Sequence, residues 1–282
     1  MRIANVSGRA CVVLDGLDGP DRWSGVDIAT TSGGRFGPGP SAVLAQWPAF
    51  VQWTRTASFA NGVTIDRAAL GPVSPNPAQV FAVGLNYRAH IAETGRETPK
   101  APAIFTKFPT CLTGPYADVH VQNTMDWEVE LVVVIGTEAR NVVASDAWSV
   151  VAGVTVGQDY SERTVQNASG GHFSMGKSYP GFGPTGPWLV TLDELANPDD
   201  LALSTIVNGV EMQSSRTSMM IYSVPALIEH LSAITPLLPG DIIFTGTPEG
   251  VGARRTPPHF LAAGDVVEST IESVGTIRNR IV

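Results

Sequence analysis

The sequence contains little cysteine and no long apolar run. Its two cysteines, Cys11 and Cys111, lie far apart and fit neither a disulfide framework nor the ligand spacing of a zinc site. No window approaches the roughly 18 consecutive apolar residues that a membrane-spanning helix requires, and the first residues lack the apolar core of a signal peptide. We therefore expect a cytoplasmic protein with no membrane partner.

Positive charge is also scarce. The chain has 18 lysines and arginines against 26 aspartates and glutamates, which gives a net charge of -8. It has no basic stretch of the kind that follows nucleic acid or anionic lipid. We expect no nucleic-acid partner, and an anionic substrate would need local positive charge from a lysine, an arginine or a metal ion.

Glycine and proline are abundant, with 29 and 21 residues, so we expect many turns and shaped loops. Further strands should begin after Gly264-Asp265, and turns are expected at Asp15-Gly16 and at 238–241. Helices are predicted over 223–234, capped by Ser223, and over 41–53, where Pro48 should break or bend the run. Strands are predicted over 2–14, 80–87, 119–122, 128–135, 151–157, 201–208 and 241–246. Strands and helices do not alternate regularly, which favours a mixed, β-rich α+β fold.

A proline-rich segment divides the chain. Residues 71–79, GPVSPNPAQ, hold three prolines within seven positions, as is typical of an extended connection. The residues before this segment contain no cluster of carboxylates or histidines. We predict a small N-terminal β-rich module over residues 1–70 and a catalytic domain over residues 71–282.

Residues 125–136, MDWEVELVVVIG, place two glutamates directly before an apolar run. Successive side chains of a strand point to opposite faces, so Glu128 and Glu130 share one face, while Val129 should point away into the packing. Two like charges this close repel each other and raise each other's pKa. The pair is therefore either a solvated sheet edge or part of a site for a hard cation such as Mg²⁺ or Mn²⁺.

A third carboxylate, Asp159, ends the apolar strand candidate at 151–157. An acid at the end of a buried strand is well placed to complete a metal site with the two glutamates. Alternatively, Asp159 caps a helix whose first turn would contain Ser161, Glu162 and Arg163. The sequence leaves both interpretations open.

His90 and Glu93 are three residues apart in GLNYRAHIAETG. On one helical turn they face the same side, and a carboxylate beside an imidazole raises its basicity, as a general base requires. The alternative is an exposed His–Glu pair on the surface. Gly84 and Gly95 flank the segment and would let it move as a lid.

Two glycine-rich segments follow. Residues 173–188, FSMGKSYPGFGPTGPW, carry one cation, Lys177, which would either hold a substrate carboxylate or lie exposed on a turn. In residues 244–252, FTGTPEGVG, glycines let backbone N–H groups and the Thr247 hydroxyl approach a ligand. A phosphate site is not expected there, because no Lys-Ser/Thr pair follows.

Taken together, these segments resemble the fumarylacetoacetate hydrolase family, in its branch of bacterial acylpyruvate hydrolases and hydroxyhepta-dienedioate isomerases. The resemblance covers roughly residues 80–280 and runs in order through GLNYRAHIAE, DWEVELVVVIG, GVTVGQDYSERTVQ, MGKSYPGFGPTGPWLVT and LLPGDIIFTGTPEGVG. It implies the family's β-roll fold, a homodimer, and Mg²⁺ or Mn²⁺ as cofactor.

The resemblance also implies roles for particular residues. The metal ligands fall on Glu128, Glu130 and Asp159, and the catalytic residues on His90, Glu93 and Lys177. Substrate-binding positions fall on Tyr87, Lys107, Arg163, Gln166 and Thr247, with Tyr179 on a loop expected against the acyl end of the substrate. Two departures bear on substrate identity: Tyr160 is bulkier than usual, and residues 177–182, KSYPGF, replace the family's K-S-F-D-T-F.

The activity implied is hydrolysis of a C–C bond in a β-diketo acid of the acylpyruvate or fumarylpyruvate type, a small keto acid, through an enolate stabilised by the metal. Alternatives on the same site are decarboxylation of the oxaloacetate type and isomerisation of 2-hydroxyhepta-2,4-diene-1,7-dioate. A non-catalytic β-fold protein is a further alternative, which the intact acidic triad, lysine and His–Glu pair argue against.

Overall fold

The computed structural model describes residues 1–14, 23–168, 170 and 172–282. Its largest element is a mixed sheet of twelve strands. β5 (Leu70–Gly71) pairs with β1 and β8 (Leu112–Thr113) pairs with β13 at the side of this sheet. The main path runs in the order β4 (Val63–Ile65), β3 (Trp23–Asp27), β2 (Arg9–Leu14), β1 (Arg2–Val6), β13 (Gly183–Val190), β11 (Val151–Gln158), β10 (Val129–Ile135), β16 (Ile242–Phe244), β6 (Val80–Gly84) and β7 (Ala103–Thr106).

Two smaller sheets and a few short helices complete the fold. One sheet has the order β15 (Val210–Arg216), β14 (Ala202–Val207), β17 (Val266–Ile271) and β18 (Gly275–Arg280), and the other pairs β12 (Ser161–Glu162) with β9 (Met125–Asp126). The α-helices are α1 (Ile28–Thr31), α2 (Pro40–Leu44), α3 (Trp47–Thr54), α4 (Arg88–Thr94), α5 (Arg163–Ala168) and α6 (Val224–Ile234). The predicted mixed, β-rich α+β class is confirmed. Within the described residues, every helix falls short of the length and apolar character needed to cross a bilayer.

Strand β10 lies at the centre of the large sheet and is buried on both faces. Val129, Leu131 and Val133 pack into one apolar cluster, while Val132 and Val134 pack into another on the opposite face. A strand covered on both sides needs no polar alternation, which explains the continuous apolar run LVVV. Val129 points away from the face that carries the glutamates, as predicted.

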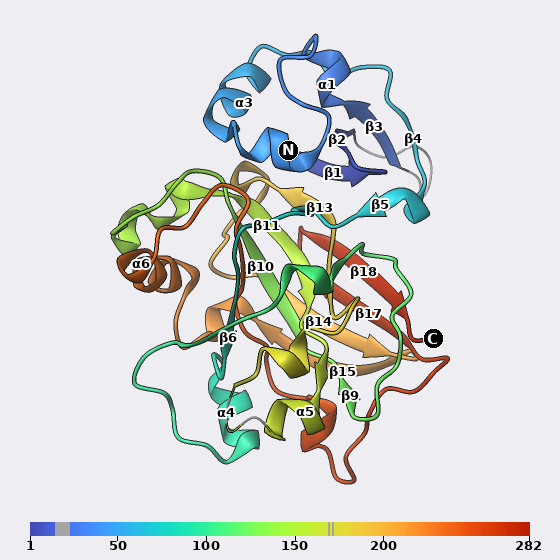
Figure 1. Cartoon of the computed structure of the whole chain (residues 1–282), viewed down its shortest axis with the longest axis vertical. Coiled ribbons are helices and arrows are strands. Elements are labelled where there is room, and N and C mark those ends of the chain that lie inside the picture. The colour runs from blue at the N-terminus through green and yellow to red at the C-terminus, as the bar shows by residue number, and fades with distance from the viewer. Residues whose placement is uncertain (15–22, 169, 171) are drawn as a thin grey trace.

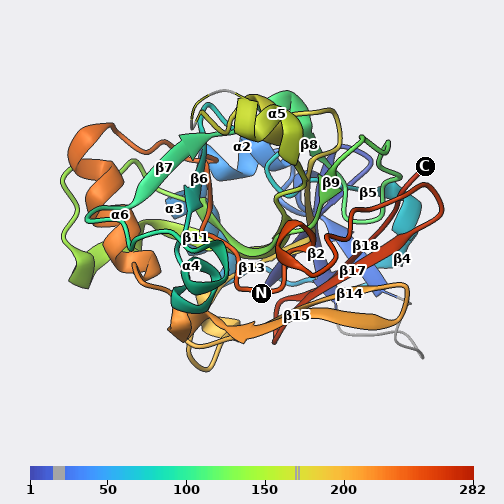
Figure 2. The ribbon, with the colours of Figure 1, turned by 90° about the horizontal axis from the view of Figure 1, so that it is seen from below.

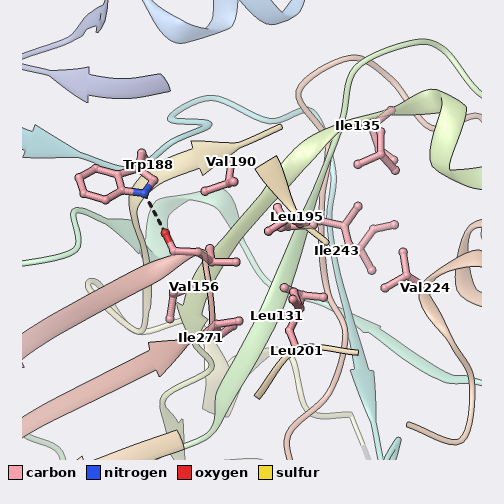
Figure 3. Close-up of a cluster of buried hydrophobic side chains, with 14 of the residues drawn as sticks. Leu131, Ile135, Val156, Trp188, Val190, Leu195, Leu201, Val224, Ile243 and Ile271 are labelled. Atoms are coloured by element: carbon pink, nitrogen blue, oxygen red, sulfur yellow. Dashed lines mark hydrogen bonds between the residues drawn. The ribbon is translucent and has the colours of Figure 1, made fainter. Parts of the chain in front are cut away.

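The first of these clusters joins the large sheet to the four-stranded sheet. Figure 3 shows Leu131 from β10, Val156 from β11 and Ile271 from β17 in this cluster. At its border the Trp188 indole N–H donates a hydrogen bond to the Val274 carbonyl at 2.8 Å. The burial of this cluster fixes the position of β10, and therefore of the acids that precede its apolar run.

The described part of residues 1–71 extends the large sheet, because β1 pairs with both β2 and β13. In Figure 1 this part, coloured blue to cyan, lies at the end of the molecule opposite α4 and α5. Phe36, Trp47, Phe50 and Trp53 form a cluster of aromatic rings there, with centroids 5.3–5.9 Å apart. The division into a module over 1–70 and a catalytic domain over 71–282 stays a prediction.

Several predicted elements differ from the observed ones. The segment 2–14 is a hairpin, because Ser7 and Gly8 adopt positive φ angles of 51° and 83° and reverse the chain. Residues 119–122 form no strand, since pairing is limited to Val119 and Val121, whose N–H groups bond to carbonyls near the end of β18. The turn expected at Asp15-Gly16 lies outside the described residues.

The two predicted helices are found with small changes. Residues 41–53 form α2 and α3, and Pro48 lies in the first turn of α3 instead of breaking the run. There its missing N–H has no helical acceptor to lose. Helix α6 begins where predicted, and its N-cap Ser223 accepts a hydrogen bond from the Ala226 N–H.

Candidate metal centre and active site

Glu128, Glu130 and Asp159 meet at one end of the β10–β11 pair. The antiparallel register sets Val129 opposite Gln158. Asp159 therefore lies beside Glu128, whose carbonyl accepts a hydrogen bond from the Asp159 N–H at 2.9 Å. One carboxylate oxygen of each acid lies within 4.8 Å of the other two, and all three side chains are buried. The alternative of a solvated sheet edge is therefore wrong.

The alternative of a helix cap at Asp159 is also wrong. Residues Ser161–Glu162 form the short strand β12, and helix α5 begins only at Arg163. Glu162 caps this helix instead, because its carboxylate accepts a hydrogen bond from the Val165 N–H at 2.6 Å. Asp159 instead bonds to the ammonium groups of Lys107 and Lys177, at 2.6 and 2.5 Å.

The three acids differ in their partners. Glu128 contacts Lys177 and Arg163, each at 2.7 Å. Burial alone would raise the pKa of Glu128, but these two cations outweigh it and lower the pKa to about 2. Glu130 is paired with no cation in the described part of the chain. Burial, followed by the charges of Asp159 and Glu128, raises the pKa of Glu130 well above its ordinary value.

The charges in this cluster do not balance. Asp126 joins the triad to give four buried carboxylates, and the cations bonded to them are Lys107, Arg163 and Lys177. With all four acids ionised, the cluster would hold four negative and three positive charges, and the excess negative charge is costly in a buried place. Three clustered carboxylates are the hard oxygen donors that Mg²⁺ and Mn²⁺ prefer, so these residues fit such an ion.

Asp126 was missed by the sequence analysis. Its carboxylate contacts the Arg163 guanidinium at 2.7 Å and accepts hydrogen bonds from the Gly252 and Ala253 N–H groups at 2.7 and 3.0 Å. A signal was available, because Asp126 continues the i, i+2 spacing of Glu128 and Glu130 backwards by one step.

The structure brings His90 and Glu93 together on helix α4. The His90 Nδ1 lies 2.7 Å from Glu93 Oε1. The second carboxylate oxygen of Glu93 accepts a hydrogen bond from the Gly250 N–H at 3.0 Å. The pair is therefore held from the loop that follows β16, and His90 is only 7% exposed. Movement of this segment as a lid stays a prediction.

The loop after β16 holds three carboxylates through its backbone. Gly246 donates its N–H to Glu130 at 2.7 Å, and further along the loop Gly250 and Gly252 donate to Glu93 and Asp126. Gly250 has φ 99°, and a Cβ there would lie 2.1 Å from the carbonyl oxygen of Met212. The glycines predicted to let N–H groups approach a ligand thus let them approach the protein's own acids.

A cavity of about 350 Å³ opens above the acidic cluster. Of the predicted site residues, six line it: His90, Glu128, Arg163, Gln166, Lys177 and Thr247. Lys177 is 2% exposed, so an exposed lysine on a turn is excluded. The cavity is also lined by residues that were not predicted, because the fold brings them together from chain segments far apart in sequence: Arg96, Phe105, Phe173, Arg254 and Phe260.

Three predicted substrate-binding residues lie outside the lining of this cavity. Lys107 is 1% exposed and bonds to Asp159 and to the carbonyls of Lys177 and Phe182, so it braces the cluster from behind. Tyr87 is buried, which raises the pKa of its hydroxyl. The Tyr179 ring packs on the Phe182 ring at 5.1 Å.

Several known proteins are similar to this chain in sequence or in structure. A family model described as fumarylacetoacetate (FAA) hydrolase C-terminal matches residues 79–282. A rat protein named oxaloacetate tautomerase Fahd2a, mitochondrial, is 44% identical over 216 residues, 76% of this chain and 69% of the relative. A Sphingomonas protein named 2,4-didehydro-3-deoxy-L-rhamnonate hydrolase is 43% identical over 207 residues, 72% of this chain and 73% of the relative. Relatives of nearly equal identity thus carry the names of different reactions.

Solved structures match over the whole length. An HpcE-like protein from Mycobacterium smegmatis has a TM-score of 0.94 at 47% identity, covering 100% of this chain and 99% of that chain. Maleylpyruvate hydrolase from Sphingobium sp. SYK-6, solved with manganese(II) and pyruvate, has a TM-score of 0.80 at 27% identity with the same coverage. The likeness therefore includes the N-terminal residues that precede the family match.

Proposed function

Since the chain belongs to the fumarylacetoacetate hydrolase family of enzymes, we propose that it is a metal-dependent hydrolase of a β-diketo acid of the acylpyruvate type. One observation carries the proposal. Glu128 of the buried acidic triad, Lys177 and His90, whose Nδ1 is held by Glu93, all line a single cavity. At the floor of that cavity, where Glu128 and Lys177 lie, the acids would bind a cation. His90 would act as a general base on the same small molecule.

The metal would be held by Glu128, Glu130 and Asp159. Supporting this are their spacing, their burial and the excess negative charge that the ionised acids would carry. The likeness to a hydrolase solved with manganese(II) favours Mn²⁺, while oxygen donors also suit Mg²⁺. When bound, the ion would act as a Lewis acid toward the keto acid end of the substrate.

Lys177 would stabilise negative charge as the C–C bond breaks. Its ammonium group is fixed between Glu128 and Asp159, and these acids, against the opposing effect of burial, raise the pKa of Lys177. It therefore stays protonated at neutral pH and can stabilise an oxygen that becomes negative during the reaction. Arg163 keeps Glu128 in place, and the Gln166 amide lines the cavity beside it.

His90 would act as the general base. Glu93 holds Nδ1, which leaves Nε2 to take a proton from water. The water oxygen then bonds to the distal acyl carbonyl, the C–C bond breaks, and its electron pair forms the enolate of pyruvate. The protonated His90 then returns its proton to the enolate carbon, which gives pyruvate and a carboxylic acid, so atoms and charge balance.

Keto–enol tautomerisation of oxaloacetate is the second candidate. The 44% identity with the rat oxaloacetate tautomerase favours it, and the same histidine could move the proton without a nucleophilic water. Decarboxylation of oxaloacetate and isomerisation of 2-hydroxyhepta-2,4-diene-1,7-dioate would use the same floor and base. The four outcomes differ in the fate of one enolate.

A substrate panel separates these candidates. The enzyme, loaded with Mn²⁺ or Mg²⁺, is given fumarylpyruvate, acetylpyruvate, oxaloacetate and 2-hydroxyhepta-2,4-diene-1,7-dioate, and the products are identified by NMR. We expect pyruvate and the matching acid from an acylpyruvate. Oxaloacetate converted between keto and enol forms, with no acylpyruvate cleaved, would overturn hydrolysis in favour of tautomerisation.

The histidine assignment has its own test. His90→Ala should reduce turnover about 10²–10⁴-fold, the usual contribution of a general base. His120→Ala is a matched control, because His120 is exposed and does not line the cavity. Undiminished turnover in His90→Ala, with metal still bound, would contradict the role of His90.

We also propose, from the family resemblance, that the enzyme is a homodimer, and, as a separate proposal, that it acts in the cytoplasm. Light scattering coupled to gel filtration checks the first part, with a mass of twice 29.7 kDa expected. Cell fractionation of the native host checks the second.

A further inference from the structure

We propose that Arg96 and Arg254 bind a second carboxylate at the mouth of the cavity, so that the substrate is a dicarboxylic keto acid. This inference rests on the proposed function, because it assumes that a keto acid end occupies the floor. It adds which chemical class of substrate the cavity selects. The observations that carry it are the partners of the cationic side chains that line this cavity.

The two cations at the floor are already engaged. Lys177 bonds to Glu128 and Asp159, and Arg163 bonds to Asp126 and Glu128. Arg163 also donates to the Gln166 side-chain oxygen at 2.8 Å. These cations hold the acidic cluster together, so little of their charge remains for the far end of a substrate.

The two cations at the mouth are different. Within the described residues, the guanidinium groups of Arg96 and Arg254 form no ion pair and no side-chain hydrogen bond. The Arg96 guanidinium lies 6.0 Å from the centroid of the Phe173 ring. Both side chains are exposed, yet both line the cavity. Their five N–H donors each are therefore available to a ligand.

The two arginines come from separate elements that the fold brings to one opening. Arg96 follows Gly95, whose left-handed conformation (φ 69°) ends helix α4. Arg254 lies in a short 3-10 helix, Gly252–Arg254, which the Asp126 carboxylate holds through the Gly252 N–H. In Figure 1, α4 and the orange-red segment that contains this short helix both lie at the lower end of the molecule. Figure 2 views that end directly.

Part of the cavity wall is apolar. Phe105, Phe173, Val251 and Phe260 line it. A ligand that spans this wall needs a carbon chain in the middle and charged groups at both ends. Guanidinium groups recognise carboxylates through paired hydrogen bonds, which an uncharged acyl end cannot accept with the same strength. The protein's net charge of -8 repels a dianion at long range, so local cations are needed to bind one.

A matched pair of non-reacting ligands tests the site without turnover. Calorimetry measures binding of 2-oxoglutarate and of 2-oxopentanoate to the Mn²⁺-loaded enzyme. The two keto acids have the same chain length and differ in whether the last carbon is a carboxylate or a methyl group. We expect 2-oxoglutarate to bind about 10–100-fold more tightly, the effect of one or two charge-assisted hydrogen bonds.

Variants assign the difference to the two arginines. Arg96→Gln and Arg254→Gln should each reduce the preference for 2-oxoglutarate, and the double variant should abolish it, while the affinity for 2-oxopentanoate stays unchanged. Arg88→Gln is the control, because Arg88 is exposed on helix α4 and lies outside the cavity. Its preference should equal that of the wild type.

The outcomes separate this inference from the proposed function. Equal binding of the two ligands by the wild type, or a preference that persists in the double variant, overturns the carboxylate site while acylpyruvate cleavage can still be observed. Binding of neither keto acid overturns both proposals. Preferential binding of 2-oxoglutarate that the double variant loses, without cleavage of any acylpyruvate, supports the carboxylate site and overturns hydrolysis alone.

Discussion

The two ends of the molecule are stabilised in different ways. At the N-terminal end, buried aromatic rings such as Phe50 and Trp47 pack against one another, and the ion pair between Arg9 and Asp27 lies near the surface. At the other end, buried carboxylates and cations meet at the start of β10. The first arrangement gains free energy from apolar burial, while the second must offset the cost of removing charges from water.

This difference indicates which region of the molecule binds a ligand. Buried charges with an incomplete set of partners reduce stability unless a ligand completes them, so their presence points to a binding role. The same strand, β10, belongs to both arrangements, because its apolar run is packed on both faces while its first residues carry acids. Four substitutions test the comparison.

The largest effect is expected at Glu130. Glu130→Gln should lower turnover about 10⁴-fold, since a Lewis acid contributes several kcal/mol to stabilising the transition state. The same change should raise the thermal midpoint of the enzyme in EDTA. The folded-state pKa of Glu130 lies above its ordinary value of 4.5, so its ionisation costs stability as the pH rises past about 4.5.

Unfolding scans in EDTA at pH 4.5 and pH 7, with turnover assays in Mn²⁺, check this prediction. The stabilisation by Glu130→Gln should be present at pH 7 and vanish near pH 4.5, where both side chains are neutral. Glu138→Gln, at an exposed position, should change neither quantity. A lower midpoint for Glu130→Gln in EDTA at pH 7 would mean that the acidic cluster does not cost stability.

The next effect concerns the aromatic end. Phe50 is fully buried among three other rings, so Phe50→Ala should cost about 4 kcal/mol of unfolding free energy. Turnover per folded molecule at 25 °C should not change. Urea unfolding and a turnover assay measure the two quantities, with the half-buried Phe59→Ala as a milder control. A large loss of turnover in folded Phe50→Ala would show that the two ends are coupled.

Glu93 comes third. Glu93→Gln keeps the shape of the side chain but removes the charge beside His90 Nδ1, so turnover should fall about 10²-fold. The thermal midpoint should stay close to that of the wild type, because Glu93 is partly exposed. Steady-state kinetics on the substrate identified by the panel measures the change, with Glu97→Gln as the exposed control. Turnover within twofold of the wild type would assign Glu93 a structural role only.

The smallest effect is expected for the surface ion pair. A hydrogen bond from Arg9 lowers the pKa of Asp27 to about 2. Arg9→Gln should return the Asp27 pKa toward its ordinary value while leaving the thermal midpoint at pH 7 almost unchanged, because exposed pairs are screened by water and salt. NMR titration of the Asp27 carboxyl carbon and a thermal scan check both statements. A drop of several degrees in the thermal midpoint would show that this exposed ion pair stabilises the fold substantially, which would contradict the comparison with the buried pairs.

Local patterns allowed much of the fold to be predicted from the sequence. The apolar run of β10 and the Ser223 cap of α6 each depend on residues that are neighbours in the chain, so their signals are visible in one short window. The contact between His90 and Glu93 could be predicted for the same reason. The hairpin at Ser7-Gly8 was missed, although its turn residues were equally local.

Long-range partners could not be predicted in this way. The ion pair of Lys107 with Asp159 joins residues 52 positions apart, and the bond from Gly250 to Glu93 joins residues 157 positions apart. Register and packing decide these contacts, and neither leaves a periodic trace in one sequence. The family resemblance identified the three acids of the triad and the base His90. The contacts that hold these residues in place, and the two arginines at the cavity mouth, could be identified only from the structure.

The loop after β16 has a consequence for how such an enzyme can acquire a new specificity. Its four hydrogen bonds to the carboxylates of Glu130, Glu93 and Asp126 come from backbone N–H groups, so the identity of most of its side chains is irrelevant to them. Changes at Thr247, Val251 or Arg254 can therefore reshape the cavity wall without disturbing the acids below. In evolution, one inherited set of acids can thus be matched to different substrates by point changes in a single loop.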